Sequence, residues 1–397
     1  MQNMLLNWVV GLMSNDLTSE PERNLHDSLV ELGVSQLEMQ ANATGEQVLL
    51  NTMRVDDPNS NNTFQSSEVV RVSAKTDGFG ELEVFVKTGE PELEPLLFPD
   101  ALSDGTFVYS EKVGVQDFPA YWSSIQADPV KRKVALEDVT TILVDETLRL
   151  KNLSCGGEVI VGEKKRTLDK LGLGSRVGDF KNIDDLIMYG ARINVSSYLV
   201  SSTNYGFEGC GIIFEILAAA PDKQICRDTV AKNIRVTSTG DYVIIDGDKS
   251  SYENPMLMAV YFATQGSLEL ELDEIEFVKE KFLEQFYGES RTDEHDKLFY
   301  ALMVDRTLRF SGHAGEKIYG GDSLNSDPKV LATYKNDLEK AMYAVGKLTE
   351  FVCGRASLQL NRLGEELIRE YRLVDCDDVL ERLEIRSEYE LNVCNLN

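Results

Sequence analysis

Three polar residues in the middle of the chain have the types that phosphoryl transfer uses, and they lie close together in the sequence. Asp228 and Asn233 are five residues apart, and Asp246 follows Asn233 by thirteen. The reaction needs a carboxylate that orients and deprotonates the acceptor hydroxyl, and oxygen ligands that hold Mg²⁺ on the nucleotide phosphates. Asp228 is therefore the candidate catalytic residue, and Asn233 and Asp246 are the candidate metal ligands.

The residues between these three predict a β-hairpin that brings them together. Residues 234–236 read as a strand, 237–241 as a turn with Gly240, and 242–245 as a buried β-branched strand that ends at Asp246. Residues 211–220 are apolar and predict a helix that leads into the loop carrying Asp228.

The stretch from Cys226-Arg-Asp228 to Asn233 resembles the catalytic loop of the protein-kinase-like superfamily, His-Arg-Asp-x-x-x-x-Asn. The run Ile245-Asp-Gly-Asp-Lys-Ser-Ser-Tyr-Glu-Asn-Pro255 is similar to its small-molecule branch, the aminoglycoside phosphotransferases and choline-kinase-like enzymes. Two positions depart from the family pattern: Cys226 stands in place of His, and Gly247 in place of an aromatic residue. The histidine of the family pattern is a structural support more than a reactive group, so we expect its loss to be tolerated.

This resemblance implies an α+β, bilobal protein-kinase-like fold with ATP and Mg²⁺ as cofactors. A small antiparallel β lobe at 66–118 would bind the nucleotide, and a larger helical lobe at 119–352 would carry the catalytic β-hairpin. Residues 1–65 and 353–397 would be an N-terminal helical and loop extension and a C-terminal helical extension.

The resemblance also implies where the nucleotide binds. Lys87 ends the strand 82–87 and would contact the nucleotide phosphates, with Lys75 as the alternative. The strand 106–111 is similar to the superfamily's hinge, which places Glu111 and Val113 against the adenine. Fewer than twenty residues separate Lys87 from that strand, so the helix that normally carries the glutamate partner of this lysine is missing, reduced or supplied from elsewhere in the chain.

Helical periodicity marks several further segments. The apolar residues of 133–150 lie near one face, and we expect the charges of this helix to form a solvated face. Other segments with helix spacing are 25–37, 272–287, 295–310 and 330–352.

Composition restricts the partners and the compartment. The net charge of −27 argues against nucleic-acid binding, because no basic surface is present to release phosphate counterions, and it favours a cationic acceptor. The six cysteines are scattered without a C-x-x-C pair, which favours a reducing, cytoplasmic location. The apolar stretch 4–13 is too short to span a bilayer, so no membrane partner is expected.

The function that these observations favour is ATP-dependent phosphorylation of a hydroxyl on a small molecule. Three alternatives stay open: a catalytically degenerate kinase-like scaffold or assembly protein, including a viral one; a phosphatase of the haloacid-dehalogenase type that uses Asp246 and Asp248; and an acidic binding module. The sequence does not specify the acceptor or the oligomeric state.

Overall fold

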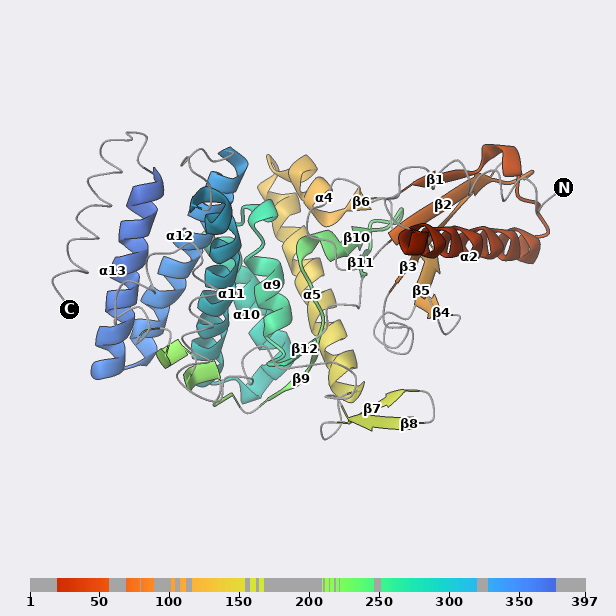
Figure 1. Cartoon of the computed structure of the whole chain (residues 1–397). Coiled ribbons are helices and arrows are strands. Elements are labelled where there is room, and N and C mark those ends of the chain that lie inside the picture. Colours follow the sequence, from red (N-terminus) through yellow and green to blue (C-terminus); the bar gives the residue numbers. More distant parts are fainter. Residues whose placement is uncertain are drawn as a thin grey trace. The chain divides into compact units, whose positions relative to one another are not determined.

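The computed structural model describes residues 20–56, 69–78, 80–88, 101–103, 108–111, 116–153, 158–161, 164–167, 209, 211–213, 215–217, 219–220, 222–245, 251–319 and 328–375 (Figure 1). These residues fall into two compact units. The first lies within 1–115, 161–164 and 237–249, and the second within 116–160, 165–236 and 250–397.

The first unit is built on a five-stranded sheet. Its strands have the order β1-β2-β3-β5-β4, and each neighbouring pair is antiparallel. The central hairpin pairs β2 with β3 so that Val69 lies opposite Lys87 and Lys75 opposite Glu81. The strands are β1 (Arg54–Asp56), β2 (Val69–Lys75), β3 (Glu81–Lys87), β4 (Ala101–Ser103) and β5 (Val108–Glu111).

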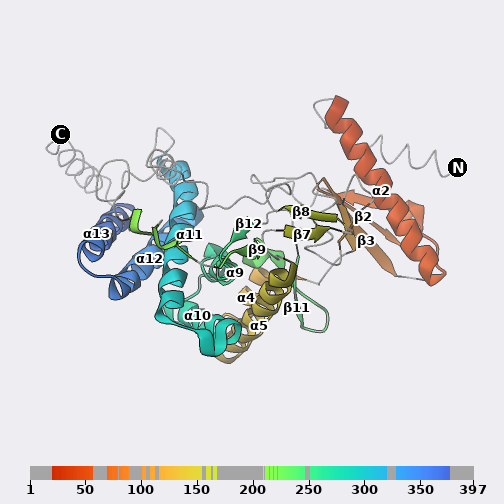
Figure 2. The ribbon, with the colours of Figure 1, turned by 90° about the horizontal axis from the view of Figure 1, so that it is seen from below.

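One long helix, α2 (Glu20–Thr44), packs on this sheet, as Figures 1 and 2 show. Its approach to β2 is close, because a Cβ atom on Gly33 would lie only 2.5 Å from Cγ2 of Val72. The side chains of a strand alternate between the two faces of a sheet, so Val70, Val72, Val84 and Val86 face the helix. Arg71, Glu83 and Lys87 lie on the other face. The buried core between helix and sheet comprises Leu29, Val30, Val34, Leu37, Val55, Val70, Val72, Ala74, Val84 and Val86.

The second unit is mainly helical. Its core includes α9, in which every residue is buried, and α5 packs along α10 while α12 packs against both α11 and α13. The helices are α4 (Phe118–Ile125), α5 (Pro129–Leu153), α9 (Leu257–Ala263), α10 (Leu272–Tyr287), α11 (Asp293–Tyr319), α12 (Pro328–Phe351) and α13 (Arg355–Asp375). The helices predicted at 133–150, 272–287, 295–310 and 330–352 are thereby confirmed.

Short strands and turns complete the described elements. Strands β6 (Gln116–Asp117), β10 (Ile234–Val236) and β11 (Tyr242–Ile244) form a sheet of order β11-β10-β6. Strand β9 (Gln224–Cys226) pairs antiparallel with β12 (Ser251–Glu253), and β7 (Glu158–Val161) is the neighbour of β8 (Lys164–Thr167). The 3-10 turns are η2 (Leu50–Thr52), η4 (Ala231–Asn233), η5 (Gly266–Leu268) and η6 (Gly288–Ser290).

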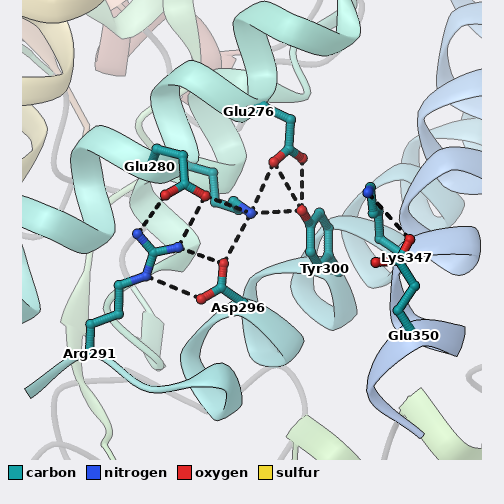
Figure 3. A network of polar contacts seen from close by, with 8 residues as sticks. Glu276, Glu280, Arg291, Asp296, Tyr300, Lys347 and Glu350 are labelled. Atoms are coloured by element: carbon teal, nitrogen blue, oxygen red, sulfur yellow. Dashed lines mark hydrogen bonds and ion pairs between the residues drawn. The ribbon is translucent and has the colours of Figure 1, made fainter.

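A charged network links α10 to the start of α11 (Figure 3). Nζ of Lys279 lies 2.9 Å from Glu276, 3.0 Å from Glu280 and 3.0 Å from Asp296. Arg291 contacts Glu280 at 2.6 Å and Asp296 at 2.7 Å. Burial opposes the charge on Lys279, but its hydrogen bonds to Tyr300 and the carboxylates outweigh this effect, so its pKa is raised. The network therefore joins the two helices through ionised groups.

The predicted fold class is confirmed: the described residues form a small antiparallel β-sheet unit and a larger helical unit. None of the described helices has the length and apolarity needed to cross a membrane.

Candidate active site

The loop that carries Asp228 begins at strand β9 and is held by three neighbouring elements. Nε2 of Gln224 donates to the carbonyl oxygen of Thr147 in α5 at 2.8 Å. Oγ1 of Thr229 donates to the carbonyl oxygen of Met258 in α9 at 2.5 Å. On β12, Glu253 pairs with Gln224. The loop is thus fixed on both sides of Asp228.

Cys226 contributes to this anchoring. Its side chain is fully buried, and Sγ lies 3.5 Å from the carbonyl oxygen of Glu253 and 3.4 Å from that of Asn254. A thiol is a weak hydrogen-bond donor, so Cys226 holds the loop against the end of β12 and the residue that follows it. These contacts are those of a structural support.

Arg227 is the charged member of the loop and is 1% exposed. Its Nη1 lies 2.6 Å from Oε1 of Glu146 in α5. Oε2 of the same carboxylate accepts from Nε of Arg149 at 2.6 Å. Burial raises the pKa of Glu146, but the hydrogen bond from Arg149 and the charge of Arg227 outweigh it, and the net pKa is lowered. The carboxylate is therefore held in its charged form.

The position of Glu146 corrects one expectation from the sequence. The charges of the helix 133–150 were expected to be solvated, yet the side chain of Glu146 is only 11% exposed. Its partner Arg227 lies 81 residues further along the chain. Local spacing carries no signal for such a pair, although a carboxylate on the same turn as buried Leu143 and Thr147 was an available clue.

Asp228 and Asn233 are brought together by the turn η4. The backbone nitrogen of Asn233 donates to the carbonyl oxygen of Val230 at 2.8 Å. Its side-chain Nδ2 donates to the carbonyl oxygen of Asp228, also at 2.8 Å. Because the amide nitrogen is committed to this bond, the amide oxygen Oδ1 is the atom left to serve as a ligand.

The carboxylate of Asp228 has an unusual environment. Its Oδ1 is buried and has no hydrogen-bond partner among the residues that the structure describes. A buried carboxylate oxygen without a partner is costly, so such a group in a native protein calls for an explanation, such as a bound water, an ion or a substrate. The unpartnered oxygen of Asp228 is therefore available to an acceptor hydroxyl, and Oδ1 of Asn233 is a hard oxygen donor of the kind that Mg²⁺ prefers.

The hairpin that follows is formed as predicted, except that its second strand ends at Ile244, one residue earlier than expected. The backbone nitrogen of Thr237 donates to the carbonyl oxygen of Asp241 at 2.8 Å, and Gly240 has φ of +89°. This conformation favours glycine. Asp246 is the next residue after Ile245 but lies outside the described residues. In the described part of the chain, no three His, Cys, Asp or Glu side chains converge on a metal position.

The predicted nucleotide-binding residues lie on the sheet of the first unit. Lys87 is half-buried at the end of β3, on the face away from α2, whereas Lys75 is exposed. Glu111 ends β5 opposite Val84. Val113 lies outside the described residues. Their contacts with a nucleotide stay predictions.

Helix α2 comes before the strands in the chain and packs on β2 and β3. Lys87 lies on the face of the sheet away from α2, so the glutamate partner of this lysine stays a prediction.

No protein-family model matches the chain, and no curated protein matches it significantly. Several solved structures are similar. The choline/ethanolamine kinase family protein of Mesorhizobium loti is 11% identical, with a TM-score of 0.46, over 84% of this chain and 99% of that one. The ethanolamine kinase of Plasmodium vivax is 10% identical, with a TM-score of 0.47, over 86% and 94%. Spectinomycin phosphotransferase APH(9)-Ia, solved with ADP and spectinomycin, is 11% identical, with a TM-score of 0.40, over 84% and 98%.

The TM-scores are below 0.5, so the function proposed below rests on the residues of this chain. The structures found are of the same two kinds that the sequence resembles, choline-kinase-like enzymes and aminoglycoside phosphotransferases.

Proposed function

We propose that this protein is an ATP-dependent phosphotransferase that transfers a phosphoryl group to a hydroxyl of a small molecule. The observation that carries the proposal is the pairing of Asp228 and Asn233. The amide nitrogen of Asn233 is bound to the loop's own backbone, while the Asp228 carboxylate presents a buried oxygen without a partner in the described part of the chain. This arrangement leaves one acidic and one amide oxygen for a ligand.

The residues have separate roles in this proposal. Asp228 orients the acceptor hydroxyl and accepts its proton, a task suited to a carboxylate. Oδ1 of Asn233 and the carboxylate of Asp246 would hold Mg²⁺. When bound, the metal neutralises charge on the phosphates.

The nucleotide would be held by the first unit. Lys87 would balance the charge of the phosphates, and the backbone from Glu111 to Val113 would contact the adenine. The half-buried position of Lys87 supports it over the exposed Lys75, because a partly desolvated ammonium group interacts more strongly with an anion.

We further propose a cationic acceptor and a reducing, cytoplasmic location. The net charge of −27 would steer a cation towards the protein. The free thiols of Cys226 and Cys353 support a reducing compartment.

Thermal unfolding with nucleotide tests the proposal, because a ligand that binds only the folded state raises its apparent stability. Wild-type protein should gain several degrees in Tm with millimolar ATP or GTP and Mg²⁺, on the order of 3 kcal/mol at about a hundredfold excess over Kd. Asp246→Ala should lose the metal-dependent part of this gain. Asp241→Ala changes a carboxylate in the exposed turn of the same hairpin and should respond like the wild type.

Asp228→Asn separates binding from transfer. This variant should keep the nucleotide-dependent rise in Tm and lose phosphorylation of any acceptor that the wild type phosphorylates. Absence of any shift in the wild type at millimolar nucleotide would exclude the active kinase and favour the degenerate scaffold.

A further inference from the structure

We infer that Glu146 is a positioning residue for this active site: through Arg227 it sets the place of Asp228 and Asn233. The inference rests on the proposed function and names a residue outside the loop on which that function depends. Glu146 lies in α5, a helix that supplies none of the candidate ligands.

The first observation is the set of donors around the Glu146 carboxylate. Nε and Nη2 of Arg149 donate to it at 2.6 and 2.8 Å, and Nη1 of Arg227 at 2.6 Å. Arg149 is one turn away on the same helix and can hold the carboxylate in a fixed rotamer. The carboxylate is therefore pre-oriented towards Arg227, and charge-assisted bonds of this length are strong and directional.

The second observation is the burial of Arg227. A guanidinium that is 1% exposed needs a carboxylate nearby, because an isolated charge in the protein interior is very unfavourable. Arg227 is the residue that directly precedes Asp228 in the chain. Moving or removing Glu146 therefore shifts the chain at the residue next to the catalytic carboxylate.

The third observation connects this shift to the metal ligand. The carbonyl oxygen of Asp228 accepts the Nδ2 hydrogen bond that orients the Asn233 side chain. A displaced Asp228 carbonyl would rotate this amide and move Oδ1, the candidate Mg²⁺ ligand. Groups that orient metal ligands from outside typically change metal affinity by about 10–100-fold when they are altered.

A matched control exists on the same helix. Glu137 of α5 accepts from Nζ of Lys281 in α10 at 2.8 Å. Glu137→Gln thus neutralises one carboxylate of α5 and weakens its ion pair with another element, as Glu146→Gln does, but it leaves the contacts of Arg227 intact.

The experiment measures the Mg²⁺ concentration at half-maximal stabilisation of the full-length protein by a fixed ATP concentration. Glu146→Gln should raise this concentration about tenfold. Glu137→Gln should leave it unchanged, and Glu146→Asp, which keeps the charge on a shorter side chain, should give an intermediate value. A Glu146→Gln midpoint equal to that of the wild type would overturn the inference.

Amide hydrogen exchange on the unliganded proteins keeps the test independent of the proposed function. Exchange in residues 227–233 should be faster in Glu146→Gln than in the wild type or in Glu137→Gln, since the loop has lost its charged anchor. If the wild type shows no nucleotide-dependent shift, the proposed function fails, whereas the exchange data still decide whether Glu146 positions the loop. Unchanged exchange in this segment would refute the positioning role.

Discussion

Two buried cations in the helical unit have opposite surroundings. Arg227 and Lys340 are each 1% exposed. Arg227 has the Glu146 carboxylate at 2.6 Å, whereas Nζ of Lys340 in α12 has no hydrogen-bond partner among the described residues. Asp337, one turn earlier, is 2% exposed, and its Oδ2 also has no partner there. Equal burial therefore corresponds to two different energetic situations.

The ionisation of the carboxylates reflects this difference. Contacts with arginines lower the pKa of Glu146 in spite of its burial. Burial raises the pKa of Asp337 to about 7, against the charges of Lys340 and Arg306. Burial also lowers the pKa of Lys340 to about 8, against the negative charges of Asp337, Glu269, Glu339 and Glu271. A direct contact holds the first pair in its charged form, and the second pair titrates near neutral pH.

The elements packed on α12 bring further polar groups. Arg306 of α11 lies over the ring of Tyr261 at 4.3 Å, and Asp305 beside it is buried. Glu370 of α13 accepts a hydrogen bond from Tyr334 at 2.6 Å. Within the described residues, none of these groups forms a hydrogen bond to Oδ2 of Asp337 or to Nζ of Lys340.

The largest change in the free energy of unfolding is expected from breaking the ion pair between Glu146 and Arg227. Glu146→Leu leaves Arg227 buried without its carboxylate, and the free energy of unfolding in urea should fall by about 3 kcal/mol. Circular dichroism against urea concentration measures this change. A loss of less than about 1 kcal/mol, the range of exposed pairs, would mean that the ion pair between Arg227 and Glu146 contributes no more to stability than a surface ion pair.

Replacing Asp337 and Lys340, the uncontacted pair, should change the free energy of unfolding in the opposite direction. The double substitution Asp337→Leu and Lys340→Met exchanges two buried charges for apolar side chains, and such exchanges are often neutral or stabilising. We expect the free energy of unfolding at about pH 7.5 to rise by about 1–2 kcal/mol. Destabilisation by a similar amount would show that the pair contributes to stability in spite of the missing contact, and the contrast with Arg227 would disappear.

The smallest effect is the pH dependence of the stability that Asp337 and Lys340 contribute. Asp337 has a pKa of about 7 in the folded protein and an ordinary value of 3.8. Between these values the folded state keeps a proton that the unfolded state has lost, so stability falls as the pH rises. Lys340 has a pKa of about 8 against 10.5. Here the unfolded state holds the extra proton, so stability rises with pH between these two values.

The contribution of Asp337 and Lys340 to the free energy of unfolding should therefore be lowest at a pH between their two folded-state pKa values. Urea titrations of the wild type and the double variant at about pH 5, 7.5 and 10 measure it, and the difference between the proteins should be largest at the middle pH, by on the order of 1 kcal/mol. A difference that does not vary with pH would show that neither group titrates in this range.

The sequence predicted the elements of the site better than their contacts. The strands 234–236 and 242–244, the turn at Gly240 and the helices α5 and α10 to α12 follow from side-chain periodicity and turn residues, which are local properties. The contact of Glu146 with Arg227 could not be predicted, because it joins residues 81 positions apart. Helix periodicity specifies a face, but it does not specify which distant group covers that face.

The same limit applies to α2. The pattern at 25–37 predicted a helix, but its packing on the sheet depends on a close fit between Gly33 and Val72, which spacing alone does not reveal. The roles of Lys87, Glu111, Val113 and Asp246 stay predictions.

The position of α2 ahead of its sheet has a consequence for biosynthesis. The helix ends at Thr44, and β3 is complete only at Lys87. At about 5–20 residues per second, its apolar face waits roughly 2–9 s on the ribosome before the strands that cover it exist. Leu29, Val34 and Leu37 are exposed during this interval. The nascent helix is thus the segment of the first unit where a chaperone would first be needed.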